Sequence, residues 1–274
     1  MTLWRTVAVK RLSHNFTRLV RYLIRAIVPF AAVLLCGLMP STAAAQTNMQ
    51  IWGNVTYAWS GRDRIAYGMD FEPKLLVVVP DGEPDWATLD ITPSADLAVK
   101  PWLDLVGEIA TGYTSQTDDL TSFEISPRMG ARFHVFSRDL AVPVHLHDRP
   151  SRRRVLVRNL VRVESRNLFY NGEKDNSFTW RFRNRIELLV PLTEARVSDD
   201  GARYATADWE WFIPLDEPDE RFANRQRIRA GIGYRRNAQW KLEALYIWGK
   251  SRNTAESGFT TSDNIVSLGV KYTR

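Results

Sequence analysis

The chain has 274 residues, with 37 lysines and arginines against 31 aspartates and glutamates, and a formal net charge of +6. The first 45 residues contain six of the basic residues and none of the acidic ones, so residues 46–274 carry no formal net charge. A charge excess confined to the N-terminal segment gives no support to a nucleic-acid partner or an anionic-membrane surface function. Residues 50–274 show no linker or low-complexity tract, which favours a single domain.

The N-terminal segment has the order of a secretory signal peptide, with basic residues first, then an apolar stretch at Ala26–Met39, then small residues. We therefore predict a signal peptide over residues 1–45, cleaved between Ala45 and Gln46. The alternative is a membrane anchor, but about 14 apolar residues fall short of the ~20 that a spanning helix requires. Cleavage also removes Cys36, the only cysteine, which suits an oxidising compartment.

After this segment, apolar and polar side chains alternate with a period of two. In residues 177–192, for example, Phe178 and Trp180 have one parity, whereas Arg181 and Arg183 have the other. Successive side chains of a strand point to opposite faces, so this period predicts β-strands, and tilted strands of about 9–11 residues suffice to cross a bilayer. The candidate strands are Gln50–Ser60, Ile65–Val79, Trp86–Val99, Trp102–Tyr113, Ser122–Ser137, Arg153–Arg166, Ser177–Val190, Ala202–Ile213, Ala223–Arg235, Gln239–Gly249 and Asp263–Thr273.

The number of candidate strands is odd, whereas bacterial single-chain membrane barrels normally have an even number. We predict twelve strands, with the missing one in Leu140–His147, and ten as the next choice. The other explanation is that the first segment does not join the wall in the ordinary way. If the last strand ends in the periplasm, three short connections lie on that side, and the long connections Asn167–Asn176 and Lys250–Ser262 lie outside.

Parity alone does not say which face of the sheet is outside. A soluble sandwich or a lipocalin-like barrel would alternate too, with its apolar side chains turned inward. The export signal, the long strands and aromatic residues near strand ends favour the membrane, so we predict an all-β fold, one antiparallel transmembrane β-barrel of 10–12 strands over residues 46–274, in the outer membrane. The aromatic residues are Trp59, Trp86, Trp209, Trp211, Trp240, Tyr246 and Trp248.

Three runs of sequence carry a family resemblance. Arg181–Glu187, Asn224–Tyr234 and Lys241–Tyr246 resemble an uncharacterised outer-membrane barrel family, domain of unknown function 2490. The resemblance implies a fold and a location, with no catalytic residues to transfer. In addition, Val266–Tyr272 resembles the C-terminal strand by which barrel-assembly machinery recognises outer-membrane proteins, although this chain ends on Thr273-Arg274 instead of an aromatic residue.

Charged residues on the predicted inward parity are unevenly distributed. An arginine-rich side faces an acidic side, which predicts a field across the lumen that selects anionic solutes. The alternative is that arginines and carboxylates pair and fill a narrow interior, with Gly231 and Gly233 leaving room for arginines that reach across. The arginines are Arg158, Arg162, Arg166, Arg181, Arg183, Arg185, Arg225, Arg227 and Arg229, and the acidic residues are Asp70, Glu72, Asp104 and Glu108.

Three histidines follow the predicted signal peptide. His134 has inward parity and is a candidate base for a lipid hydrolase, but no spacing singles out a nucleophile. His145 and His147 would share a face but lack a third metal ligand, so we predict no metal and no cofactor.

From the barrel pattern and the charged interior we predict a narrow channel or solute-binding pore in contact with outer-membrane lipid. An outer-membrane lipid hydrolase or a plugged structural or partner-binding barrel is the alternative, and an enzymatic role is less favoured.

Overall fold

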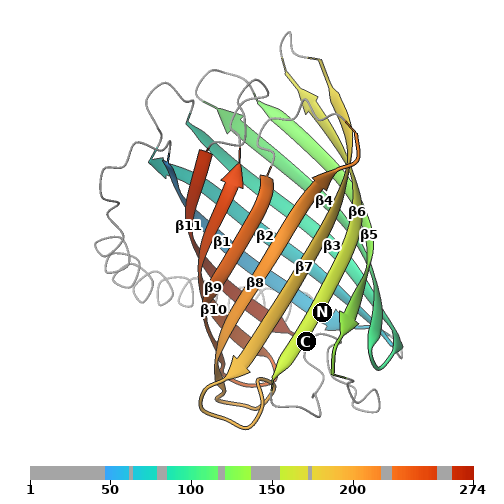
Figure 1. Cartoon of the computed structure of the whole chain (residues 1–274), viewed down its shortest axis with the longest axis vertical. Coiled ribbons are helices and arrows are strands. Elements are labelled where there is room, and N and C mark those ends of the chain that lie inside the picture. Colours follow the sequence, from blue (N-terminus) through green and yellow to red (C-terminus); the bar gives the residue numbers. More distant parts are fainter. Residues whose placement is uncertain are drawn as a thin grey trace, which may run out of the picture. The chain divides into compact units, whose positions relative to one another are not determined.

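A computed structural model describes residues 47–61, 64–78, 85–116, 121–136, 155–171, 175–216, 224–251 and 261–274, and these ranges fold as strands and short connections (Figure 1). Among them, no helix is long and apolar enough to cross a membrane. The predicted signal peptide, its cleavage site and the candidate strand Leu140–His147 lie outside the described ranges. The strands are β1 (Thr47–Ser60), β2 (Ile65–Val78), β3 (Trp86–Lys100), β4 (Leu103–Gln116), β5 (Ser122–His134), β6 (Leu156–Tyr170), β7 (Ser177–Pro191), β8 (Arg203–Pro214), β9 (Asn224–Arg235), β10 (Trp240–Ser251) and β11 (Thr261–Thr273).

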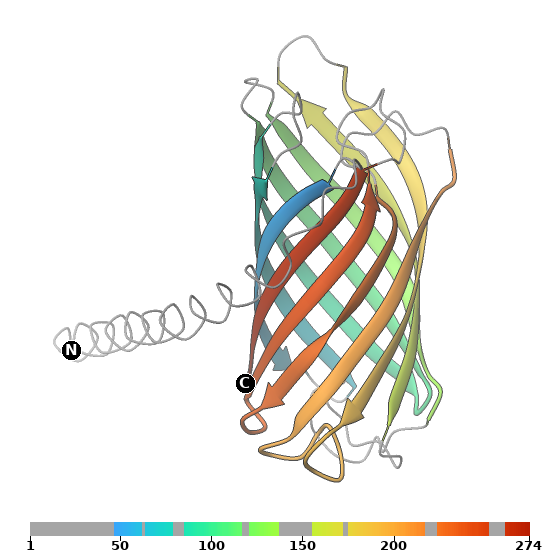
Figure 2. The same cartoon turned by 60° about the vertical axis from the view of Figure 1, so that its left-hand side comes forward.

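The eleven strands close into one barrel in which β1 pairs with both β2 and β11. All consecutive pairs are antiparallel, but β1 and β11 are parallel, from Thr47 opposite Ser262 to Ala58 opposite Thr273. Figure 2 shows β1 in blue beside β11 in red. When directions alternate around an odd number of strands, the first and last point the same way, so closure requires one parallel pair. The preferred number of twelve was wrong, and the unusual joining of the first strand is confirmed.

The parallel seam between β1 and β11 is reinforced by side chains inside the barrel. Asp263 Oδ1 accepts hydrogen bonds from Asn48 Nδ2 at 3.0 Å and Gln50 Nε2 at 2.9 Å. The Trp52 indole donates to Gln50 Oε1 at 2.8 Å. Parallel pairing is slightly weaker per residue than antiparallel pairing. These buried bonds therefore add stability where the ladder is weakest.

The apolar parity of the strands faces outward and the charged parity faces inward. Met129 is 77 % exposed and Phe178 62 %, whereas Arg183 is 8 % exposed and Glu164 is completely buried. This agrees with the parity predicted for residues 177–192. The lipocalin-like alternative, with apolar side chains inside and polar ones outside, does not match the arrangement.

The two ends of the barrel differ, and we name them by their connections. The turn end holds the end of β11 and the short β3–β4 and β9–β10 connections, as predicted. The loop end holds the start of β1 and the β6–β7 and β10–β11 connections. The predicted long connection Asn167–Asn176 is shorter than expected, because β6 continues to Tyr170. Only residues 171–176 remain between β6 and β7.

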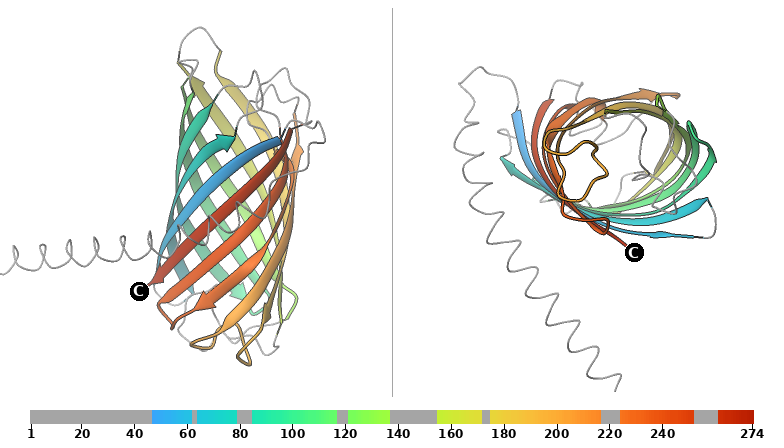
Figure 3. Two further views of the ribbon diagram at one scale, coloured as in Figure 1. Left: turned by 90° about the vertical axis from the view of Figure 1, so that its left-hand side faces the viewer. Right: turned by 90° about the horizontal axis from the view of Figure 1, so that it is seen from below.

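One long connection, residues 192–202, lies at the turn end. Viewed from below in Figure 3, this loop, in orange, lies over one side of the barrel opening. Val197 is 8 % exposed and packs with Leu189 and Tyr204. Gly201 has a φ of 81°, the left-handed region that favours glycine, and its N–H donates to the Arg235 carbonyl at 2.8 Å. The loop is thus anchored to β9 and covers part of the interior.

Candidate functional site

Ten charged side chains from β4–β9 meet inside the barrel, and we call them the central cluster. Glu210 Oε1 accepts hydrogen bonds from Arg183 Nη2 at 2.8 Å and Arg162 Nη2 at 3.1 Å. Glu164 accepts one from Arg183 Nη1 at 2.9 Å and another from Arg181. Both carboxylates are completely buried, so their negative charge depends on these partners. The other members are Glu108, Arg128, Asp208, Arg227 and Arg229.

An inward glycine allows one arginine of the cluster to reach past a neighbouring strand. Gly130 on β5 pairs with Arg162 on β6, and a Cβ added to Gly130 would lie 2.7 Å from Arg162 Cγ. With no side chain there, Arg162 crosses β5, and its Nη1 lies 2.7 Å from Glu108 Oε2 on β4. Arg162 therefore joins Glu108 on one side to Glu210 on the other.

The predicted gap at Gly233 exists, but a tyrosine occupies it. A Cβ at Gly233 would lie 2.0 Å from the ring of Tyr204, which is completely buried. Across this gap, Tyr204 Oη donates to Glu243 Oε1 at 2.8 Å. At Gly231 a Cβ would meet the backbone of β10, 2.1 Å from the Ala244 carbonyl oxygen. Neither glycine makes room for an arginine.

The remaining predicted arginines lie on the same side of the interior, two of them in close ion pairs. Arg158 Nη2 lies 2.6 Å from Glu187 Oε2, and Arg166 Nη2 lies 2.6 Å from Glu124 Oε2. Arg185 is half-buried, and Arg225 is exposed near the loop end of β9. Carboxylates are therefore interspersed among the arginines, which reduces the field that an unbroken row of arginines would produce.

The predicted acidic residues fall into three environments. Glu108 belongs to the central cluster and contacts arginines directly. Asp104 lies near the turn end, 2.9 Å from His134 Nε2. Asp70 accepts a hydrogen bond from Thr56, and Glu72 lies 2.8 Å from Lys74 Nζ. Of the four, Glu72 lines a cavity near the loop end.

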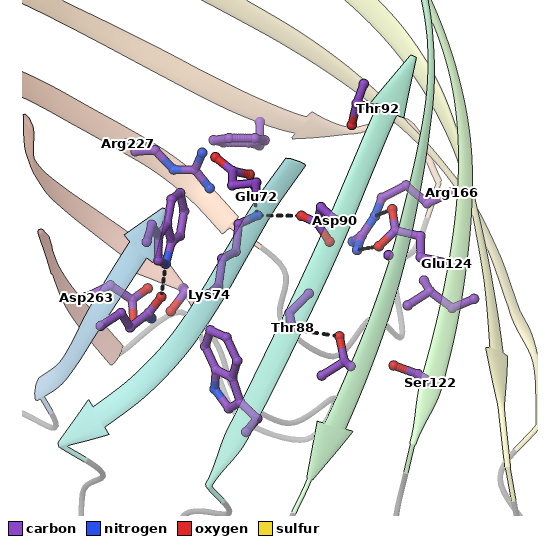
Figure 4. A pocket seen from close by; sticks show the side chains of 18 of the residues that line it. Glu72, Lys74, Thr88, Asp90, Thr92, Ser122, Glu124, Arg166, Arg227 and Asp263 are labelled. Carbon is purple, nitrogen blue, oxygen red and sulfur yellow. Dashed lines mark hydrogen bonds and ion pairs between the residues drawn. The ribbon is translucent and has the colours of Figure 1, made fainter. Parts of the chain in front are cut away.

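A cavity of about 190 Å³ lies inside the barrel between the loop end and the central cluster (Figure 4). Trp86 at the start of β3 and Ser251 at the end of β10 line it near the loop end, and Arg183 and Arg227 line it from the cluster. Trp86 was expected on the apolar exterior, and that expectation was wrong. The residue before it, Asp85, is outside the strand, and Trp86 has the inward parity of β3.

On β2 and β3 the cavity has a small group of charges that the parity analysis only partly identified. Lys74 Nζ lies 2.5 Å from Asp90 Oδ2 and 2.8 Å from Glu72 Oε2. Two carboxylates therefore share one ammonium group, which leaves one negative charge in excess. Both carboxylates keep about a quarter of their side-chain surface exposed, 27 % for Asp90 and 28 % for Glu72. We call these three residues the acidic group.

Arg227 has the weakest ion pairing of the central cluster. Its Nη1 lies 3.9 Å from Glu210 Oε2, and its Nε has no hydrogen-bond partner among the described residues. Instead, its guanidinium lies 4.8 Å from the centre of the Trp52 ring and 5.3 Å from that of Phe212. Six guanidinium groups face four carboxylates in the cluster, so the cluster itself holds two more positive than negative charges, and Glu72 on the cavity wall is near enough to act on Arg227 electrostatically. Arg227 presents part of this excess to the cavity (Figure 4).

The hydrolase alternative rests on His134, which lies away from the cavity. Its side chain is 3 % exposed, and its Nε2 lies 2.9 Å from Asp104 Oδ2. Arg132 binds Asp96 beside it at 2.9 Å. A base must reach a substrate proton, and burial in a charge network does not favour that role. His145 and His147 lie outside the described residues, and within the described ones no three His, Cys, Asp or Glu side chains are grouped to hold a metal.

Several residues of the site were missed by the sequence analysis. Glu210 lies between two outward tryptophans of β8, so its parity alone predicts an inward carboxylate. Lys74 and Asp90 likewise have inward parity on β2 and β3. The position of Trp52 gives no such signal, because an aromatic residue on the polar parity looks like an exception to the pattern rather than part of a site.

The sequence comparisons agree with the predicted resemblance. The chain matches the model of a family described as Protein of unknown function (DUF2490) over residues 49–260. The match covers most of the chain, including the segments that suggested the resemblance. No curated protein matches the sequence.

Proposed function

The chain belongs to the DUF2490 family, and we propose that it is an outer-membrane barrel that binds small solutes carrying an anionic group in the cavity near its loop end. The observation that carries this proposal is Arg227, which lines an interior cavity and whose ion-pair contact with Glu210, at 3.9 Å, is the longest in the central cluster. Buried guanidinium groups bind carboxylates and phosphates through charge-assisted hydrogen bonds. A solute that supplies such a group completes the ion pairing that the protein leaves incomplete.

The exterior of the barrel supports a membrane location. Strands of 12–15 residues, at about 3.3 Å per residue and a tilt of about 40°, span roughly 30–40 Å. The hydrocarbon core of a bilayer is about 30 Å thick. Aromatic rings gather near both ends, with Tyr57, Trp59 and Tyr272 in contact at the turn end, and Phe169 and Phe178 at the loop end. Such girdles are typical of outer-membrane barrels.

A charge introduced at Met129, on the outer surface of β5, tests the membrane location. We expect Met129→Arg to destabilise the barrel by about 2–4 kcal/mol, the range for a charge facing lipid near the bilayer midplane. The measurement is a urea titration of the protein refolded in lipid vesicles. In a water-facing protein, a substitution at a side chain that is 77 % exposed would change stability by about 0.5 kcal/mol or less. Recovery of the wild-type protein as a soluble periplasmic monomer would also contradict the proposal.

The central cluster lies on the turn-end side of the cavity, and it favours binding of a solute over its free passage through the barrel. Arg162 reaches from Glu108 to Glu210, and Arg183 joins Glu210 to Glu164, so ion pairs connect β4 with β8 through the interior. The loop of residues 192–202 covers part of the turn end. An ion that crossed would have to separate buried charge pairs, which is costly at low dielectric.

We therefore expect the purified protein to show no sustained openings in planar lipid bilayers. The measurement is single-channel recording in 1 M KCl, with the folded state of the same sample verified by its change in gel mobility on boiling. Long-lived, discrete openings with anion selectivity would contradict a closed binding barrel and favour the narrow-channel interpretation. The proposal includes two partners. Outer-membrane lipid would surround the barrel, and the assembly machinery would contact β11, the C-terminal strand.

A further inference from the structure

The cavity has two opposite charge excesses. Arg227 on β9 belongs to a cluster in which six guanidinium groups face four carboxylates and has only a long contact of 3.9 Å with Glu210, whereas the acidic group on β2 and β3 holds two carboxylates against one ammonium. In the wall, β2 and β9 are separated by β1, β11 and β10, yet both groups line the same cavity (Figure 4). A ligand with a single charge satisfies only one of them.

Trp52 on β1 lies beside Lys74 of the acidic group and beside Arg227. Its ring lies 4.5 Å from Lys74 Nζ and 4.8 Å from Arg227 Cζ. The indole also donates a hydrogen bond to Gln50 at 2.8 Å, which fixes its position at the seam. The ring is 6 % exposed and lines the cavity, so it holds Lys74 and Arg227 in place on either side of the space that a ligand would enter.

We propose that the solute is a small zwitterion, with its anionic group at Arg227 and its ammonium group at the carboxylates of Glu72 and Asp90. The inference rests on the proposed function and adds a cationic group to the ligand. Both carboxylates are about a quarter exposed, and each has oxygen atoms beyond the one that contacts Lys74. A bound ammonium would cancel their excess charge, as the anionic group would cancel that of Arg227.

The test compares ligands of matched carbon chains. Isothermal titration of the detergent-folded protein uses ω-amino acids from β-alanine to 6-aminohexanoate, together with the alkyl carboxylate and the alkylamine of each length. The series covers the separation of the two groups, so a poor fit at one length does not decide the result. We expect at least one amino acid to bind about tenfold or more tightly than either singly charged analogue, because a charge-assisted hydrogen bond contributes about that factor.

Two variants should abolish this advantage. Glu72→Gln leaves Asp90 alone with Lys74, so the amino acid should bind no more tightly than the carboxylate. Asp90→Asn removes the other carboxylate and should do the same, which guards against a folding defect in either variant. Glu243→Gln is the control, since it removes an interior carboxylate that does not line the cavity. It should leave the preference unchanged.

The outcomes separate this inference from the proposed function. If carboxylates bind as tightly as amino acids, and Arg227→Gln abolishes both, the zwitterion inference is overturned while anion binding remains. If alkylamines bind as tightly as amino acids, both are overturned. If no ligand of the series binds at millimolar concentration, and inorganic phosphate does not bind either, both proposals fail together.

Discussion

Glu210→Gln is expected to destabilise the folded barrel by about 3–5 kcal/mol, the range for removing one partner of a buried ion pair. Glu210 is completely buried and lies within 4 Å of four arginines. Glutamine preserves the shape of the side chain but removes the charge, so the excess in the central cluster rises from two positive charges to three. The measurement is the urea concentration at which the heat-modifiable band is lost.

The matched variant is Arg227→Met. It removes one of the two excess positive charges and keeps an unbranched apolar chain between Trp52 and Phe212, so we expect it to change stability by less than about 1 kcal/mol or to increase it. Glu194→Gln, at an exposed position of the turn-end loop, should have no effect. If Arg227→Met cost more than Glu210→Gln, the charge balance assigned to the central cluster would be wrong.

The two variants test whether a residue that binds a ligand lowers the stability of the protein without that ligand. Arg227 adds to the repulsion among the arginines of the central cluster, and a bound anion would relieve it. The residue is therefore expected to lower stability without ligand and to couple binding to stability, because a ligand that binds only the folded state stabilises it. A purely structural arginine would be paired as closely as Arg166 is with Glu124, at 2.6 Å.

The period-two pattern was sufficient to predict the strands and to separate their two faces, whereas the export signal, the strand lengths and the aromatic residues near strand ends indicated which face is inward. Arg181 and Arg183 lie inside and Phe178 and Trp180 outside because the pleat alternates strictly along β7. The partners of those arginines were not predictable, since they depend on contacts between strands that are not neighbours. Arg162 reaches Glu108 only because Gly130 on the strand between them has no side chain. Parity identifies that glycine as inward, but not which side chain crosses it.

Closure of the barrel was the other feature that the pattern left open. Alternation within β1 is the same whether its second neighbour is parallel or antiparallel, so the odd strand count pointed to a missing strand as readily as to a parallel seam. The polar inward residues of β1, Asn48 and Gln50, are a signal in retrospect, because they bond to Asp263 across that seam. Trp86 was misplaced because its aromatic side chain was assigned to the apolar face, although it has the same parity as the inward Thr88 and Asp90 of β3.

The parallel seam leads to the last prediction, which concerns the two ends of the barrel chain. Because β1 and β11 run in the same direction, β1 starts at the loop end and β11 finishes at the turn end. A barrel with an even number of strands would place both on one side. If the turn end faces the periplasm, we expect an epitope tag inserted directly before Thr47 to be exposed on the cell surface. A tag after Arg274 should lie on the periplasmic side of the outer membrane.

The measurement is antibody labelling of intact and permeabilised cells. A third tag in the β9–β10 connection, residues 236–239, marks the turn end and should behave like the C-terminal tag. Labelling of the N-terminal and C-terminal tags on the same side would contradict the eleven-strand closure, whereas labelling of only the C-terminal and β9–β10 tags on intact cells would reverse the orientation. If the barrel lies in the outer membrane as proposed, the start of β1 must also cross the membrane during assembly. A short epitope before Thr47 should therefore be tolerated, but a folded domain there should prevent closure, because only an extended chain can pass with β1 to the loop end.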